Sequence, residues 1–240
     1  MQQERNKKEV ENYYDNYTSR QLRAGINKRH KSILNLLKEN GLKKNHCVLE
    51  VGCGIGTVSG LIAKYLSKGK LTSIDLSPKS IEIAKKRLNS FKNINFIACD
   101  ITIMNIEGQF DFIVLPDVLE HIPIEQHNKL FSKLNSVLKP EGAIYIHIPD
   151  PLYLDGVRLN RPEDLQIIDQ SLNVEHIVSL AKENGFYITY LGSYSIWTKP
   201  IEYQHILMKK KEYVSSIKAI TYKPGFWKKA KYKLKLLLKK

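Results

Sequence analysis

The sequence predicts an α/β fold in which a mostly parallel, seven-stranded sheet has an antiparallel edge and helices on both faces. Two patterns lead to this prediction. Between residues 48 and 148, short apolar runs alternate with segments whose apolar residues recur at helical spacing, and this order produces parallel strands. After residue 170, one helical segment is followed by two apolar runs, and such a hairpin forms an antiparallel edge.

Local start and stop signals place the individual elements. Ser77 and Pro78 indicate a helix start, with the serine as N-cap and the proline in the first turn. Residues 139–142 (Lys-Pro-Glu-Gly) indicate a helix stop and a turn, and Pro149 and Pro151 precede a polar stretch that runs to about residue 170. Strands are expected at residues 48–51, 71–74, 94–98, 110–115, 143–148, 186–196 and 203–208, and helices at residues 58–66, 80–88, 125–138 and 174–184.

These patterns divide the chain into three expected parts. Residues 1–40 are helical in pattern and precede the first strand, so they are placed to form a lid over the sheet. The α/β domain spans residues 41–210, and a basic amphipathic tail spans residues 211–240.

The composition fits a globular domain with appendages. With 240 residues, 42% of them hydrophobic, the chain is long enough to bury a sizeable core. No apolar run approaches the roughly 18 residues of a membrane-spanning helix, and we expect no secretory signal after Met1. The cysteines Cys47, Cys53 and Cys99 are odd in number and lack CxxC spacing, so we expect buried free thiols and a cytoplasmic location.

The positive charge is concentrated at the C-terminus. Of the formal net charge of +14, residues 209–240 carry +11, from twelve lysines and one glutamate. On a helix, Trp227, Leu234 and Leu237 fall on one apolar stripe surrounded by lysines. This pattern is typical of a helix that lies on an anionic membrane surface, which is the function we expect of residues 225–240. A solvated tail, docking on protein, and RNA backbone binding are the alternatives.

The first predicted strand ends in a glycine-rich turn, with the sequence VLEVGCGIGT over residues 48–57. Glycine is required where φ is positive or where a ligand approaches the backbone closely. The helix that follows presents unpaired amides that favour an anionic group. Because ligands of open parallel sheets bind at the carboxyl ends of the strands, this turn is the predicted ligand site.

Two details distinguish this turn from a dinucleotide-binding loop. The spacing is GxGxG rather than GxGxxG, and Glu50 stands inside the strand just before the loop. A carboxylate at that place would repel a pyrophosphate but attract the ammonium of an amino acid. The turn therefore favours a ligand with a zwitterionic amino-acid end.

Acids also stand at the ends of the next two predicted strands. Asp75 can accept from both hydroxyls of a ribose, and Asp100 can accept from an exocyclic amine. Each aspartate alone is also typical of a helix cap. Three acids at the ends of three successive strands, together with the glycine turn, favour a nucleoside-bearing ligand.

These residues resemble motif I and the acidic positions after it in the class I S-adenosylmethionine-dependent methyltransferases, a Rossmann-like family. The similarity covers about residues 45–150 and extends more loosely to about residue 210. It implies S-adenosylmethionine as cofactor, with the glycine loop around the methionine part, Asp75 at the ribose, and Asp100 with Ile101 at the adenine. The residues expected at the cofactor are Tyr14, Tyr17, Glu50, Gly52, Cys53, Gly54, Gly56, Asp75, Leu76, Asp100, Ile101 and Pro116.

The fourth predicted strand leads into Leu-Pro-Asp-Val-Leu-Glu-His over residues 115–121, at the edge that faces the transferred methyl group in this family. The run resembles the branch with ubiquinone-pathway and sugar O-methyltransferases. It lacks the (N/D)PP(Y/F) motif of base N-methylation and the Pro-Cys pair of cytosine-C5 methylation. A hydroxyl acceptor needs alignment and a base that removes its proton, and Asp117 and His121 are the candidates.

Other interpretations of these residues stay open. His121 is also typical of a capping or partly buried histidine. Tyr14 and Tyr17 of the expected lid are also typical of ordinary helix packing. Asp117, Glu120 and His121 would bring three metal ligands within five residues. We predict no metal, because the similar run in quinone-pathway enzymes begins with Glu rather than Asp and many relatives carry it without metal. His147, between two isoleucines, indicates a core or sheet-face position.

The sequence therefore predicts a methyltransferase acting on a hydroxyl of a small or lipid-linked molecule, such as a sugar of a cell-surface glycan or a quinone precursor. The expected location is cytoplasmic, at the inner face of the membrane if the tail binds there. An RNA methyltransferase whose tail holds RNA, and a non-catalytic cofactor-binding module, are the alternatives.

Overall fold

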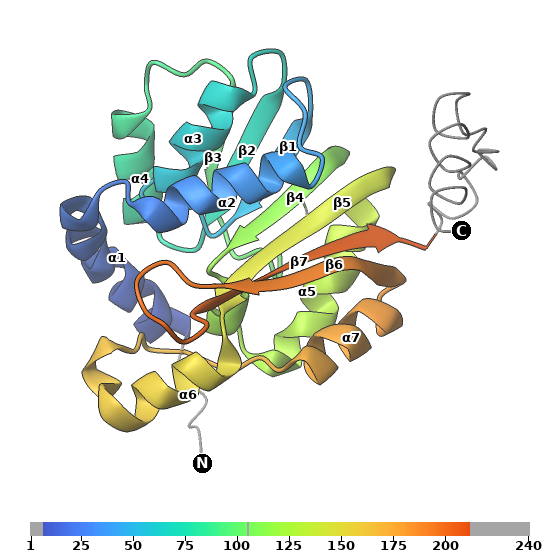
Figure 1. Cartoon of the computed structure of the whole chain (residues 1–240). Helices are drawn as coiled ribbons and strands as arrows, with labels where there is room; N and C mark the ends of the chain where they lie inside the picture. Colours follow the sequence, from blue (N-terminus) through green and yellow to red (C-terminus); the bar gives the residue numbers. More distant parts are fainter. Residues whose placement is uncertain (1–6, 105, 212–240) are drawn as a thin grey trace, which may run out of the picture.

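The computed structural model describes residues 7–104 and 106–211. At its centre is a seven-stranded sheet with the strand order β3-β2-β1-β4-β5-β7-β6 (Figure 1). Strands β1 to β5 pair in parallel, whereas β7 runs antiparallel to both β5 and β6. The predicted Rossmann-like α/β fold is confirmed, including its antiparallel edge.

The helices and strands alternate along the chain as the apolar pattern predicts. The strands are β1 (Cys47–Val51), β2 (Lys70–Asp75), β3 (Ile94–Ala98), β4 (Phe110–Pro116), β5 (Leu138–Pro149), β6 (Phe186–Tyr194) and β7 (Tyr203–Lys210). The helices are α1 (Lys7–Ala24), α2 (Lys28–Glu39), α3 (Thr57–Tyr65), α4 (Pro78–Arg87), α5 (Ile124–Val137), α6 (Pro151–Asn160) and α7 (Val174–Glu183), with 3-10 turns η1 (Leu119–His121) and η2 (Pro162–Asp164).

The sheet is buried on both faces. On one face, α5 and α7 pack their apolar sides, including Phe131 and Ile177, against Leu115 and neighbouring strand residues. On the other face, α2 and α3 pack against residues that include Phe112 and Tyr145. Burial on both faces explains why the central strands are nearly continuous apolar runs that the sequence reveals clearly.

Two segments differ from the sequence prediction. Helix α6 stands where a polar stretch was expected. Asp150 caps it by accepting from the N–H groups of Leu152 and Tyr153, and Pro151 occupies the first turn. The expected turn at residues 139–142 lies inside β5. There Leu138 pairs with Phe110 and the ladder resumes only at Ala143, so the four residues bulge out of it.

The remaining sequence predictions about the body of the chain concern membranes and cysteines. Among the described residues, no helix is both long and apolar enough to cross a bilayer. All three cysteines are free; Cys53 is buried as expected, but Cys47 and Cys99 are only half-buried. The amphipathic helix predicted for residues 225–240 lies outside the described part of the chain.

Candidate active site

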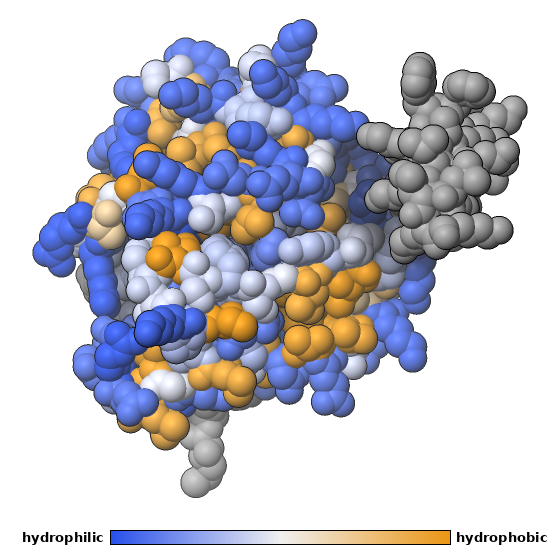
Figure 2. Space-filling view, viewed as in Figure 1, coloured by the Kyte–Doolittle hydropathy of each residue, from blue (hydrophilic) through white to orange (hydrophobic). Residues whose placement is uncertain are grey.

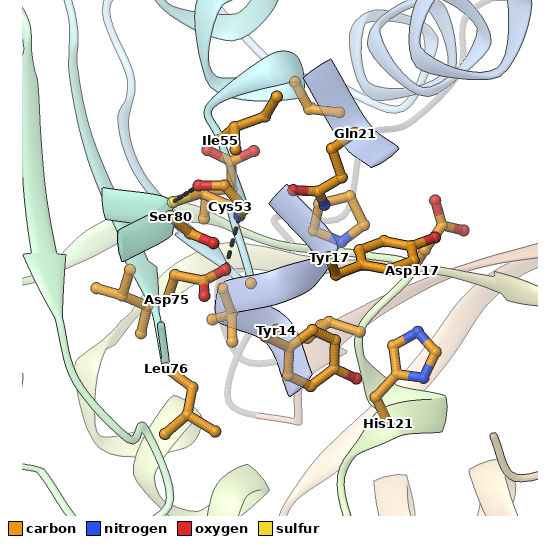
Figure 3. A pocket seen from close by; sticks show the side chains of 18 of the residues that line it. Tyr14, Tyr17, Gln21, Cys53, Ile55, Asp75, Leu76, Ser80, Asp117 and His121 are labelled. Atoms are coloured by element: carbon orange, nitrogen blue, oxygen red, sulfur yellow. Dashed lines mark hydrogen bonds between the residues drawn. The ribbon is translucent and has the colours of Figure 1, made fainter. Parts of the chain in front are cut away.

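A cavity of about 420 Å³ lies at the carboxyl ends of the parallel strands, with α1 as its roof. Figure 3 shows Tyr14 and Tyr17 of α1 between Cys53 and Asp75 on one side and Asp117 and His121 on the other. With one exception, every residue that the sequence placed at the cofactor or in catalysis lines this cavity. The exception is Gly56, which caps α3 and lies against Leu88 and Ala84 of the α4 segment.

The glycine loop between β1 and α3 has two positions that no larger residue fits. Gly52 and Gly54 both have positive φ angles, of 73° and 52°. A Cβ on Gly52 would collide with the branched side chain of Val118, and one on Gly54 would lie 2.8 Å from Nε2 of Gln21 in the roof. The loop therefore runs directly beneath α1, with only backbone between the strand end and the cavity.

Glu50 presents an unsatisfied carboxylate oxygen at the cavity wall. The residue is fully buried; its Oε2 accepts from the hydroxyls of Ser59 (2.5 Å) and Ser73 (2.7 Å). Its Oε1 is buried and has no hydrogen-bond partner among the described residues. Burial raises the pKa of Glu50 to about 7, although both serine hydroxyls oppose the shift. A buried acceptor of this kind fits a cationic donor in the cavity.

The two aspartates that follow β2 and β3 are oriented by the backbone. Asp75 accepts from the N–H groups of Gly54 (2.6 Å) and Ser77 (2.9 Å), and burial raises its pKa. Asp100 accepts from the N–H and the hydroxyl of Thr102 through one oxygen. Because a carboxylate oxygen has two acceptor sites, these contacts leave capacity for hydroxyl or amine donors of a nucleoside.

Helix α1 covers the cavity and is hydrogen-bonded to the segment that follows β2. The Ser77 hydroxyl, at the start of α4, donates to the Asp15 carboxylate. The Tyr14 hydroxyl and Gln21 Oε1 are buried and have no hydrogen-bond partner in the described structure. These two polar atoms come from residues that line the cavity, so the roof supplies donors and acceptors of its own.

The far end of the cavity holds a histidine between carboxylates. Nδ1 of His121 lies 2.6 Å from the Ile168 carbonyl oxygen and 3.1 Å from Asp169, so this nitrogen carries a proton. Its Nε2 lies 3.8 Å from Oε1 of Glu120. Burial alone would lower the pKa of His121, but Glu120 and Asp169 raise it to about 9. Burial raises the pKa of Glu120 to about 8.

Asp117, the other catalytic candidate, is held from three sides. Its φ of 56° is the only positive value outside glycine in the described chain, and its N–H donates to the His147 carbonyl. Its carboxylate meets Nδ1 of His147 at 2.5 Å and Arg29 at 3.4 Å. Burial opposes ionisation, but Arg29 and His147 hold the pKa of Asp117 well below its usual value. Asp117 is therefore an ionised hydrogen-bond acceptor.

The contacts of Asp117 include residues that sequence reasoning did not place in the site. His147 was expected in the core, and it is indeed buried, but its Nε2 also lies 2.6 Å from the Tyr194 hydroxyl. Arg29, in the first turn of α2, lies over the ring of Tyr203 and lines the cavity. The only local signal was the polar character of Arg29 and His147 in otherwise apolar or helical segments.

The described residues contain no group of three or more His, Cys, Asp or Glu side chains arranged to hold a metal ion. In the described structure His121 pairs with Asp169, and Asp117 pairs with His147 and Arg29.

Residues 48–142 match the family model described as a methyltransferase domain. Over this segment the chain is similar to methyltransferases. Malonyl-[acyl-carrier protein] O-methyltransferase 1 of Ilyobacter polytropus is 36% identical over 105 residues, which are 44% of this chain and 38% of that protein. Ubiquinone biosynthesis O-methyltransferase of Coxiella burnetii is 35% identical over 106 residues, 43% of each chain. The chain thus spans less than half the length of both curated relatives.

Solved structures share the fold over a larger part of the chain. Magnesium protoporphyrin IX methyltransferase from Synechocystis PCC 6803 with bound SAH has a TM-score of 0.68 and 19% identity, covering 85% of this chain and 100% of that one. A SAM-dependent methyltransferase from Methanosarcina mazei has a TM-score of 0.62 and 19% identity, covering 72% and 96%. At this level of identity the likeness establishes the fold.

Proposed function

We propose that this chain is an S-adenosylmethionine-dependent O-methyltransferase that acts on a hydroxyl of a small or lipid-linked acceptor. Examples of such an acceptor are a glycan sugar and a quinone precursor. The observation that carries the proposal is the unpartnered Oε1 of Glu50 beside the glycine loop, because it fits the ammonium of the cofactor. The O-methyltransferase names of the two relatives support the choice of oxygen as acceptor atom.

The cavity residues divide the cofactor among them. Glu50 and the loop residues Gly52, Cys53 and Gly54 would hold the methionine end, and Asp75 with Leu76 would hold the ribose. The adenine would lie against Asp100 and Ile101, and the roof residues Tyr14 and Tyr17 would exclude water. Pro116 would complete the wall at the end of β4. When bound, S-adenosylmethionine supplies an electrophilic methyl group on a positively charged sulfur.

His121 and Asp117 are the residues we assign to the acceptor. The ionised Asp117 would accept a hydrogen bond from the acceptor hydroxyl and orient its oxygen. His121 would take the proton through Nε2, since Nδ1 is occupied by Ile168 and Asp169. Because the pKa of His121 is about 9, its basic form grows with pH, and the reaction rate should rise through the alkaline range.

Calorimetric titration with S-adenosylhomocysteine tests the cofactor assignment directly. We expect micromolar affinity for the full chain and its loss in Asp75→Ala. Asp111→Asn is the matched control, because Asp111 contacts Lys139 and the Cys47 N–H at the other end of the sheet. No binding by the wild-type chain would disprove the proposal. Tight binding without turnover on any glycan or quinone acceptor would favour a non-catalytic module.

The basic residues 225–240 suggest where the protein would meet such an acceptor. We propose that residues 225–240 bind an anionic membrane surface, because seven lysines accompany an apolar stripe in that segment. Full-length protein with these lysines changed to glutamine should lose binding to anionic vesicles. Loss of RNA binding without any change in vesicle binding would instead favour the RNA methyltransferase alternative.

A further inference from the structure

Three segments are joined to one another by contacts, and we call them the rim: residues 20–31 around the α1–α2 turn, the β6–β7 loop at residues 195–202, and α6 with η2. Arg20 of α1 contacts Asp164 of η2 at 3.9 Å. The N–H of Asp150, before α6, donates to the carbonyl of Glu202 at 2.8 Å.

Further contacts join the β6–β7 loop to α2 through Tyr203. Trp197 of the loop packs edge-on against Tyr203, with ring centroids 6.1 Å apart. Arg29 of α2 lies over the same Tyr203 ring at 5.9 Å. Arg29 and the α1–α2 turn line the cavity, and the other two segments contact these cavity-lining elements, so the rim lies next to the cavity.

The rim carries large apolar side chains that face solvent. They include the two most exposed large hydrophobic residues of the described chain, both on α6, and Figure 2 shows hydrophobic surface over that helix. Large exposed apolar side chains gathered on neighbouring segments mark interaction sites more often than singly scattered ones do. The six side chains and their exposed fractions are Leu22 48%, Ile26 53%, Leu152 80%, Leu159 83%, Trp197 52% and Ile201 49%.

Cations without acidic partners accompany these apolar side chains. Arg23, Lys28, Lys31 and Lys199 are exposed and form no ion pair within the described structure. The acids of the same segments are largely neutralised, since Asp155 pairs with Arg158 and Asp164 pairs with Arg161. The rim thus combines Trp, Leu and Ile with uncompensated positive charge, which fits the headgroup region of an anionic bilayer.

We infer that this rim rests on the surface of an anionic phospholipid bilayer and directs the cavity mouth toward it. The acceptor class that this arrangement favours is a lipid-linked molecule whose reactive headgroup enters the cavity while its chain stays in the membrane. This acceptor class rests on the proposed function, whereas the binding of the rim to lipid does not.

The rim is separate from the basic tail. Strand β7 begins at Tyr203, beside the rim, and ends at Lys210, so the described chain leaves the sheet at the opposite end (Figure 1). Substitutions in the rim and in residues 225–240 therefore test two different surfaces. A protein that uses both would bind vesicles in two additive, separable ways.

Vesicle co-sedimentation of full-length variants tests the rim. The vesicles contain equal parts of phosphatidylcholine and phosphatidylglycerol, and every protein carries the lysine-to-glutamine tail. The rim variant combines Leu152→Ser, Leu159→Ser and Trp197→Ser. The matched control combines Val174→Ser, Val178→Ser and Leu191→Ser, which remove exposed apolar side chains from the α7–β6 patch seen in Figure 2.

We expect the rim variant to bind these vesicles about tenfold more weakly or worse, because three apolar side chains no longer leave water. The control should bind like its parent. Equal binding by the rim variant, equal loss in the control, or rim-dependent binding of an acidic carrier protein in place of vesicles would overturn the inference. Affinity for S-adenosylhomocysteine, measured on the same samples, reports separately whether the proposed function fails.

Discussion

Of the two carboxylate oxygens of Glu50, one accepts hydrogen bonds from two serine hydroxyls, and the other is buried without a partner in the described structure. The pKa of Glu50 rises from 4.5 to about 7 on burial, so the folded protein holds this proton more tightly than the unfolded chain does. The stability that Glu50 contributes is therefore lost as pH rises from 4.5 through about 7. A bound ammonium would reverse this preference by favouring the ionised form.

We predict that affinity for S-adenosylhomocysteine rises between about pH 6 and about pH 8, as Glu50 ionises. In Glu50→Gln the rise should disappear, and affinity at the upper pH should fall about tenfold or more, since a charge-assisted hydrogen bond contributes roughly 1.5–3 kcal/mol. Calorimetric titration across the pH range measures both effects. The prediction fails if Glu50→Gln keeps the wild-type pH dependence.

The pair Arg29–Asp117 joins the lid side of the cavity to the catalytic floor. The nitrogen and oxygen atoms are 3.4 Å apart, and the side chains are 31% and 14% exposed, so solvent screens the pair only partly. We predict a coupling free energy of about 1 kcal/mol in a double-mutant cycle with Arg29→Gln and Asp117→Asn.

The readout is unfolding in urea, followed by the affinity for S-adenosylhomocysteine. Arg20–Asp164 provides the comparison pair, because it also joins the N-terminal helical segment to a distant part of the chain. Its side chains are 56% and 42% exposed, and its nitrogen and oxygen atoms are 3.9 Å apart. Its coupling should stay below about 0.5 kcal/mol. Equal coupling free energies in the two cycles would contradict a stronger interaction of Arg29 with Asp117 than of the exposed pair.

At the scale of elements, α1 is the helix whose local stability a ligand in the cavity should change most. Its contacts with the floor pass through Tyr14, Asp15 and Gln21, and two of these residues have buried polar atoms without partners. We predict that S-adenosylhomocysteine slows amide hydrogen exchange in α1 (Lys7–Ala24) at least severalfold, because the ligand supplies the missing contacts. Helix α7 is the internal control, and equal protection of both helices would contradict a lid role for α1.

The sequence predicts most strands because each is buried on two faces and forms an apolar run. It places the end of β6 at residue 196, whereas the strand ends at Tyr194. The N–H groups of Ile196 and Trp197 instead donate to the Glu202 carboxylate, a contact between residues that no local pattern connects. Helix α6 was missed although Asp150-Pro151 repeats the start signal of Ser77-Pro78, because the residues after it lack a clear apolar stripe.

The cavity position of most residues that we assign to the cofactor could be predicted, because they follow a local motif and the ends of successive strands. The partners of Asp117 could not, because they meet it only through tertiary structure. His147 reaches Asp117 by the register of β4 and β5, where Pro116 pairs with His147, and Arg29 arrives on α2 from far upstream. Gly56 was placed at the cofactor with the other glycines, yet its close neighbours belong to the α4 segment.

For the whole molecule, buried titratable groups act in two opposing directions on stability. Burial keeps several histidines neutral: the folded-state pKa is lowered to about 4 in His30, His127 and His205. Their contribution is present above 6.5, the ordinary value, and is lost as pH falls toward about 4. In the other direction, Glu50, Glu120 and His121 have raised pKa values of about 7, 8 and 9, so their contribution is lost as pH rises.

These opposing shifts predict a maximum in the free energy of unfolding near about pH 6.5, with losses on both sides. Urea unfolding of the protein without ligand, at about pH 5, 6.5 and 8.5, measures the curve. Two variants separate its arms. His127→Asn should flatten the acid side, because His127 of α5 is fully buried and contacts His176 of α7. Glu120→Gln should flatten the alkaline side, because the pKa of Glu120 is raised to about 8. Stability that increases steadily from acid to alkaline pH would mean that the buried carboxyl groups are ionised in the folded chain, and that the cavity already satisfies Oε1 of Glu50 before any ligand enters.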